Sequence, residues 1–273
     1  MYKAFVVAKY DLTRLLSSKV ILFYVLSYIP LGVGIVYLGA YGYRELGLSG
    51  FGPIVASLVN FTLLLSGLMA IAISSLSIVG ERERGFLRLV LAQPITRRMY
   101  MLGKFLSHYL GVVLATTAGF GVTALFSSLV LSAEDLDVFL VFVAIALAYL
   151  APMSALGLFI SVVSESRFSA IIATIATWFL FTSVYQLVIT AVDTMLKLSW
   201  RQIALSALVN PVEAARLLYI YTLDPRLVYL GQVGVYFALE FGPLIPSLTL
   251  MSLGAWTLTF LLLALLLMDK IDL

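Results

Sequence analysis

The sequence predicts an all-α membrane protein with six transmembrane helices, and its composition and its uncharged runs carry this prediction. Of the 273 residues, 62% are hydrophobic and 11% are charged, whereas soluble domains carry about 25% charged residues. Six runs without Asp, Glu, Lys or Arg exceed the roughly 17 to 25 residues of a helical span: 20–43, 46–80, 105–133, 138–164, 168–192 and 241–268. Helices are expected because lipid cannot satisfy unpaired backbone groups.

A single transmembrane domain over 1–273 is therefore expected, with spans at 20–40, 54–79, 105–131, 138–163, 168–192 and 247–268. Residues 1–18 place apolar side chains on one arc and polar ones opposite, which predicts an amphipathic helix on the membrane surface; a helical extension of the first span is the alternative. Segment 193–246 is expected to be extracytoplasmic and helical. Its uncharged run 227–239 is too short to span and fits an interfacial or re-entrant helix.

The basic residues orient the chain in the plasma membrane. With six spans, twelve Lys and Arg fall on the side of the termini and five on the other side. The excess predicts cytoplasmic termini. The net charge of +3 then reflects orientation, and no nucleic-acid partner is expected.

Residues 81–104, between the second and third spans, carry six of the seventeen Lys and Arg. We expect a cytoplasmic elbow over 81–98, with a helix from Glu81 to Ala92 that ends before Pro94, because a residue preceding proline disfavours the helical region. Arg84 and Arg88 would lie one turn apart. These charges fit a protein contact or anionic lipid headgroups, and both interpretations stay open.

The remaining polar residues indicate packing more than chemistry. There is no cysteine, nucleotide-binding loop or hydrolase motif, so no catalytic residue and no metal site is predicted, and the substrate-binding residues are unknown. The lone His108 is expected to be structural. Gly111, Ala115 and Gly119 predict a close helix contact. The Ser and Thr side chains of the second span fit packing or, less favourably, an aqueous path.

A helix start is expected at Asn210, with Pro211 at the first position and Glu213 at the third, the arrangement of a capping box. Arg216 lies on the same face as Glu213. These four residues are interpreted as a structural cap or as a contact for an extracytoplasmic partner.

The chain combines an amphipathic start, the two spans that follow it, the sequence ERERGFLRLVLAQPITRR and Gly103-Lys104. In these features it resembles the type-2 ABC exporter permeases. Trp178, Phe179, Leu180 and Tyr185, with Asn210, Pro211, Glu213 and Arg216, look like one branch, the permease of the copper-processing system for nitrous oxide reductase maturation. Gln186 departs from that branch, in which Asp is common at this position.

The resemblance implies a homodimer served by two separate cytoplasmic ATPase subunits, which bind ATP and magnesium, so this chain needs no cofactor. It implies that the ATPases dock on the first elbow and on the short second elbow. The interface residues so implied are Glu81, Arg82, Glu83, Arg84, Gly85, Phe86, Arg88, Leu89, Gln93, Pro94, Glu165 and Arg167.

The expected function is thus that of a permease, not an enzyme, which exports a substrate or transmits force across the membrane. A membrane scaffold or receptor for an extracytoplasmic partner is the first alternative. An ATP-independent secondary transporter is the second, and the absence of ionisable residues from the middle of the six spans disfavours it.

Overall fold

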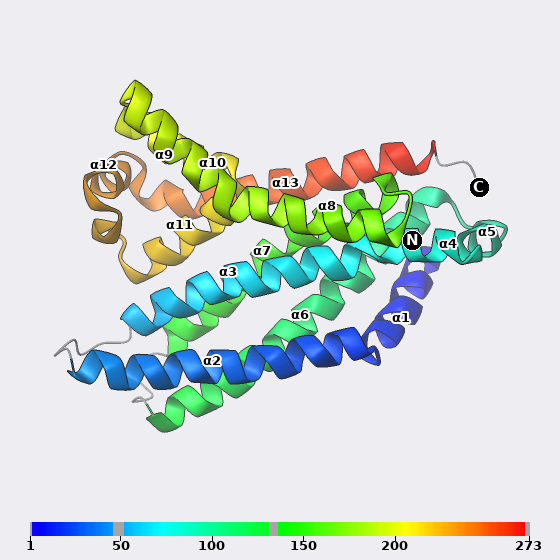
Figure 1. Cartoon of the computed structure of the whole chain (residues 1–273), viewed down its shortest axis with the longest axis horizontal. Helices are drawn as coiled ribbons and strands as arrows, with labels where there is room; N and C mark the ends of the chain where they lie inside the picture. The colour runs from blue at the N-terminus through cyan, green and yellow to red at the C-terminus, as the bar shows by residue number, and fades with distance from the viewer. Residues whose placement is uncertain (1, 46–51, 131–135, 271–273) are drawn as a thin grey trace.

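The computed structural model describes residues 2–45, 52–130 and 136–270, and the regular elements within these ranges are all helices. α1 and the end of α13 lie at the same end of an elongated bundle as α4 and α5, whereas α9, α10 and α12 lie at the opposite end (Figure 1). The α-helices are α1 (Tyr2–Leu16), α2 (Lys19–Glu45), α3 (Gly52–Ser75), α4 (Ser77–Glu83), α5 (Phe86–Leu91), α6 (Arg97–Val130), α7 (Leu136–Val163), α8 (Arg167–Phe179), α9 (Tyr185–Leu196), α10 (Trp200–Val209), α11 (Pro211–Leu223), α12 (Gly231–Phe241) and α13 (Ile245–Met268).

Six helical stretches in the described residues are long and apolar enough to cross a membrane, as the sequence predicts. They are Lys19–Leu38, Ser57–Glu83, Arg97–Thr123, Leu140–Val163, Arg167–Leu196 and Gly231–Met268. The helix of the third span, α6, begins at Arg97, eight residues before the predicted start of that span at residue 105. The predicted limits at residues 1 and 131, and the tail beyond residue 270, lie outside the described residues.

The core is built around α7, which packs against α3, α6, α11 and α13. Of its apolar window 67% is buried, the highest fraction among the six spans. Close contact with α3 depends on Gly157, because a methyl group there would lie 2.5 Å from the Ile71 carbonyl oxygen and 2.7 Å from Ser74 Cβ. Small residues therefore let these two helices approach closely.

The polar side chains of α3 serve packing. Thr62 Oγ1 lies 3.0 Å from Tyr28 Oη, and Thr174 Oγ1 donates to Ser75 Oγ at 2.8 Å. The small-residue face of α6 is also confirmed, since a methyl group at Gly119 would lie 2.6 Å from Tyr28 Cδ1. Hydrogen bonds and small residues together tie α2, α3, α6 and α8.

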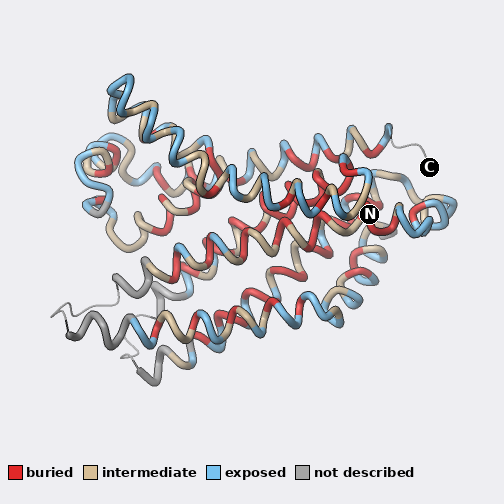
Figure 2. Tube along the Cα trace, in the orientation of Figure 1, coloured by how far each residue is buried: buried red, intermediate tan, exposed pale blue. Residues whose placement is uncertain are grey.

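The fifth span, formed by α8 and α9, is the least covered. Only 11% of its apolar window is buried, and its exposed side runs along the bundle in Figure 2. Its exposed side chains are large and apolar, among them Ile172, Ile175 and Leu187. Such a surface requires lipid or a second protein surface to cover it.

Candidate functional site: the first elbow and the hairpin tip

The first elbow consists of two short helices and not of one. Gly85 has φ +71°, and this left-handed residue ends α4 and lets the chain turn into α5. The continuous helix predicted from Glu81 to Ala92 is therefore wrong. Arg84 lies at the end of α4 and Arg88 on α5, so these two residues do not share a helical face.

Leu87 anchors α5 to the bundle. Its side chain is fully buried in a cluster that includes Leu158 and Val162 of α7 and Ala264 and Met268 of α13. The opposite side of α5 stays outside, with Leu89 67% exposed. Burying a leucine stabilises by about 1.5 to 3 kcal/mol, so α5 is attached firmly while one face remains free for contacts.

An apolar groove lies between α5 and α1. It measures about 570 Å³, and its walls are Val6, Val7, Phe86, Leu89, Val90, Gln93, Pro94 and Ile95. The groove combines the exposed face of α5 with the start of α1. The predicted interface residues Phe86, Leu89, Gln93 and Pro94 are therefore brought together on one surface.

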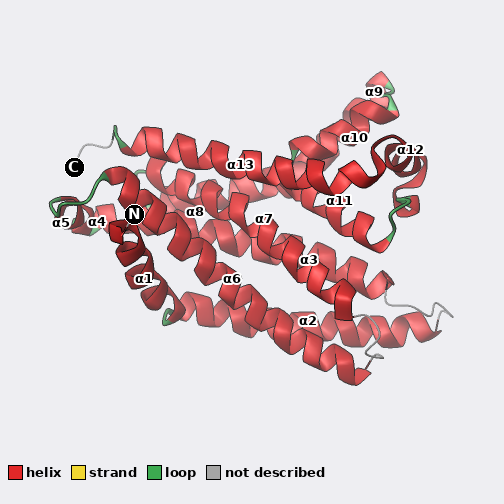
Figure 3. Cartoon of the chain, turned by 180° about the vertical axis from the view of Figure 1, so that it is seen from behind, coloured by secondary structure: helices red, strands yellow, loops and turns green. Residues whose placement is uncertain are grey.

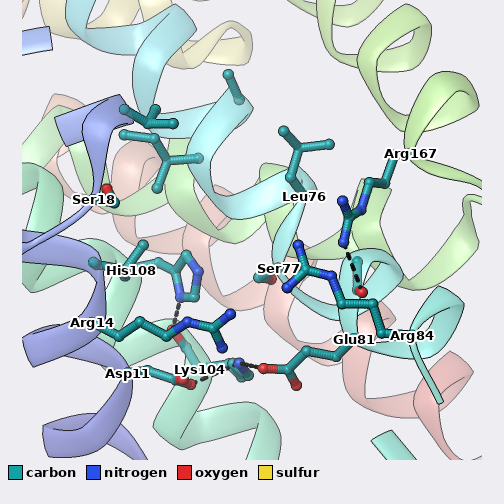
Figure 4. Close-up of a pocket in the computed structure, with 15 residues that line it drawn as sticks. Asp11, Arg14, Ser18, Leu76, Ser77, Glu81, Arg84, Lys104, His108 and Arg167 are labelled. Carbon is teal, nitrogen blue, oxygen red and sulfur yellow. Dashed lines mark hydrogen bonds and ion pairs between the residues drawn. The ribbon is translucent and has the colours of Figure 1, made fainter. Parts of the chain in front are cut away.

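Lys104 lies buried at the base of the elbow, between two carboxylates (Figure 4). Its Nζ is 2.7 Å from Asp11 Oδ2 of α1 and 2.5 Å from Glu81 Oε1 of α4. Tyr100 donates a further hydrogen bond to Glu81. His108 is buried beside the cluster, with Nδ1 2.8 Å from the Lys104 carbonyl oxygen. Three helices are thus joined by one buried ammonium group.

Glu81, which the resemblance places in the ATPase interface, lies inside the bundle of the single chain. Glu81 is only 8% exposed, and its carboxylate is used by Lys104 and Tyr100. A buried charge needs compensating partners. Glu81 therefore holds the elbow in place from within.

The second elbow is bonded to the first. Arg167 Nη2 donates to the Gly80 carbonyl at 3.0 Å, and Arg167 Nε lies 3.1 Å from Glu83 Oε2. Arg82 donates to the Ser164 carbonyl. Hydrogen bonds and an ion pair therefore join the two elbows, which are predicted as separate contacts, into one unit. Glu165 is exposed beside it.

At the other end of the bundle, α10 and α11 form a hairpin bent by 112°. Asn210 at its tip donates from Nδ2 to the Phe181 carbonyl at 2.8 Å. Phe181 lies 14 residues after Arg167 and 15 before Leu196, at the middle of the fifth span. Trp256, which donates to the Val209 carbonyl at 2.9 Å, is near the middle of α13. The tip therefore lies half-way along the fifth span and α13. This position differs from the predicted extracytoplasmic location of 193–246.

Side chains from both neighbouring spans satisfy the carbonyls at the end of α10. The last four carbonyls of a helix lack intrahelical partners, and in a membrane this costs several kcal/mol for each unsatisfied group. The Tyr185 hydroxyl donates to the Ser206 carbonyl at 2.6 Å. The Ser252 hydroxyl of α13 donates to the Leu208 carbonyl at 2.5 Å. These bonds allow a helix to end inside an apolar bundle.

The Phe181 carbonyl, which accepts the hydrogen bond from Asn210, lies in a π-helical segment of the fifth span, Leu180–Val184. The Tyr185 N–H, which would bond to Phe181 in an α-helix, bonds to the Leu180 carbonyl. The Phe181 carbonyl therefore does not accept from the Tyr185 N–H, and Asn210 donates to it. Such segments are frequent at functional sites.

Asn210 acts as the predicted cap, because its Oδ1 accepts from the Val212 N–H at 2.8 Å. Pro211 occupies the first helical position. The Glu213 carboxylate bonds to Arg216, with Nη1 2.7 Å from Oε1. The predicted pairing of these two residues is confirmed. Their side chains are 17% and 19% exposed, so an ion pair lies at the tip of the hairpin.

Ionisable residues at such depth are costly and are commonly functional. None is predicted in the middle of the six spans, and 193–246 is predicted to lie outside the membrane. The structure adds Glu213 and Arg216 through the hairpin. Among the described residues, no group of three or more His, Asp or Glu is placed to hold a metal ion.

Comparisons with known proteins identify a family and two relatives. Residues 6–273 match the family model described as ABC-2 family transporter protein. The probable ABC transporter permease protein NosY of Stutzerimonas stutzeri is 31% identical over 221 residues, 78% of this chain and 79% of its own. The protein of the same description from Pseudomonas aeruginosa is 32% identical over 224 residues, 80% of this chain and 82% of its own.

These matches confirm the predicted resemblance to type-2 ABC permeases and to the predicted branch. The family model covers every span, both elbows and the hairpin. The chain belongs to the ABC-2 family of transporter proteins.

Proposed function

We propose that this permease works as a homodimer driven by two separate cytoplasmic ATPase subunits, each seated on the groove between α1 and α5. This proposal rests on α5, which is anchored by the buried Leu87 and exposes Leu89 and Phe86. An apolar groove beside an exposed arginine, Arg88, suits a partner surface with apolar side chains and acidic neighbours.

The second copy covers the exposed apolar side of the fifth span. That side is continuous over α8 and α9, and large side chains dominate it, among them Ile172 and Leu187. A symmetric dimer through this side leaves both elbows at the cytoplasmic end, where two ATPases can approach together.

Force from the ATPases passes to the outer half of the membrane through α13. Its cytoplasmic end packs against Leu87 of α5 through Ala264 and Met268, and its middle holds the hairpin tip through Trp256. A rigid displacement of the elbow therefore moves the hairpin with it. Export of a substrate and transmission of force to an extracytoplasmic partner both use this path.

The docking surface is tested with Arg88→Glu and Leu89→Asp combined, assayed with an ABC ATPase subunit that co-purifies with the wild-type chain. We expect loss of ATPase co-purification and at least a tenfold fall in permease-dependent ATP turnover in nanodiscs. Arg98→Glu, an exposed site on the neighbouring α6, is the control. Unchanged association and turnover in the double variant would refute the docking surface.

The same reconstitution separates the alternatives. A scaffold would bind an extracytoplasmic partner with no dependence on ATP. A secondary transporter would move solute along an ion gradient in vesicles that contain only this chain.

A further inference from the structure

A second cavity, separate from the α1–α5 groove, opens at the base of the elbow. It measures about 320 Å³ and is bounded by α1, α3, α4, α6 and the start of α8. This volume is within the roughly 300 to 1,000 Å³ typical of small-molecule sites. The cavity shares no lining residue with the groove proposed for the ATPase.

Three arginines converge on this cavity. Figure 4 shows the guanidinium groups of Arg14 and Arg84 extending toward the space between α1 and α4, whereas the Arg167 guanidinium is bonded to the Gly80 carbonyl. Arg167 is paired with Glu83. Within the described part of the chain, Arg14 and Arg84 have no acidic partner within ion-pair distance. Two guanidinium groups of the cavity lining therefore have no ion-pair partner among the described residues.

The acidic residues near the cavity cancel part of this charge. Asp11 and Glu81 share the one ammonium group of Lys104, at 2.7 and 2.5 Å. Counting His108 as neutral, the lining holds four cationic and two anionic side chains, and Glu83, which pairs with Arg167, leaves an excess of one positive charge. Guanidinium groups are suited to bidentate bonds with phosphate oxygens.

The other wall of the cavity is apolar. Leu15, Val20, Ala72, Ile73 and Leu76 line it on the side of the spans. Beyond it, the outer faces of α2 and α8 carry exposed apolar side chains, with Val20 53% and Ile171 44% exposed. A ligand in this cavity therefore meets cations at one end and a hydrocarbon surface at the other.

We propose that this cavity binds the phosphate headgroup of an anionic phospholipid, with the acyl chains lying along α2 and α8. The cavity sits at the cytoplasmic ends of the spans, where anionic headgroups are found and attract basic residues. Because Arg14 belongs to α1 and Arg84 to α4, the bound headgroup bridges the amphipathic helix and the elbow. The lipid thereby becomes part of the unit that receives the ATPase.

The test uses the detergent-solubilised full chain titrated with phosphatidylglycerol, with phosphatidylcholine as the neutral lipid and thermal stability as readout. We expect phosphatidylglycerol to raise the melting temperature of the wild type. In Arg14→Gln with Arg84→Gln, the lipid concentration for half the effect should rise at least tenfold. Arg98→Gln with Lys270→Gln removes two exposed charges outside the cavity and should leave the lipid concentration for half the effect unchanged.

A conservative variant protects the test against misfolding. Arg14→Lys with Arg84→Lys keeps the charge and should retain preference for the anionic lipid, with weaker binding because lysine cannot form a bidentate bond. Native mass spectrometry should show one retained phosphatidylglycerol in the wild type and its loss in the Gln variant.

Three results would overturn the proposal. Equal effects of the two Gln pairs would show that the response is a general surface effect. Stabilisation by inorganic phosphate or glycerol phosphate as strong as that by the lipid would show a soluble-phosphate site. If the cavity variant loses ATPase binding but keeps its response to phosphatidylglycerol, the arginines serve a protein partner.

Discussion

The Asn210 side chain donates a 2.8 Å hydrogen bond to the Phe181 carbonyl, 29 positions earlier in the chain. The same side chain caps α11 through the Val212 N–H. One residue therefore ends the hairpin turn, starts the next helix and joins both to the fifth span.

Replacing Asn210 by Ala should cost about 1 to 3 kcal/mol, because a cap is lost and the buried Phe181 carbonyl loses its partner. Thermal unfolding in detergent measures the change. Ser199→Ala is the matched control, since Ser199 caps α10 at an exposed end where water can replace it. Equal losses in both variants would contradict the role given to the tip.

Removing the charge of Lys104 should be among the most damaging single changes. Lys104→Met leaves Asp11 and Glu81 buried without their counter-ion, and breaking a buried pair costs about 3 to 5 kcal/mol. Lys9→Met, an exposed lysine of α1, should have little effect. Adding Asp11→Asn and Glu81→Gln to Lys104→Met should recover most of the loss. A triple variant as unstable as the single one would argue against an electrostatic cause.

The contact between α3 and α7 predicts a sharp difference between two glycines. Gly157→Ala should destabilise by about 1 to 3 kcal/mol, because the methyl group meets the Ile71 carbonyl and cannot be accommodated without a shift of the backbone. Gly254→Ala has open space around it and should be neutral or slightly stabilising. Unfolding midpoints of the two variants, measured in the same detergent, give the comparison.

The Glu213–Arg216 pair can be examined with a double-mutant cycle. Arg216→Met alone leaves a largely buried carboxylate, whereas Glu213→Gln with Arg216→Met removes both charges. We expect the pair to show a coupling energy of about 0.5 to 3 kcal/mol, the range for contacting residues. Arg201 and Glu240, an ion pair with the arginine side chain 64% exposed, provide the control cycle. A coupling no larger than in that exposed pair would show that the tip is well hydrated.

Local patterns in the sequence predicted much of this fold. The uncharged runs located the six spans, and Asn210 followed by Pro211 marked a helix start, because each signal lies within a few residues. Contacts between distant residues were out of reach. Lys104 meets Glu81 and Asp11 from 23 and 93 positions away, so only the packed structure brings them together.

Two further features escaped prediction for different reasons. The glycine in ERERG was visible, but the sequence does not reveal that Gly85 adopts the left-handed conformation that divides the elbow. The depth of the hairpin was hidden because α10 and α11 are each too short to span, and their bonds to Tyr185, Ser252 and Trp256 have no local signature.

The π-helical segment Leu180–Val184 gives the fifth span a polar contact point while its helix continues on both sides. A proline would also free a carbonyl, but it would remove a backbone N–H donor inside the span. Here helical hydrogen bonding continues on both sides of the contact point. A deletion of one residue within this segment would restore ordinary helical winding, close the carbonyl and uncouple the hairpin, while leaving the length of the span almost unchanged.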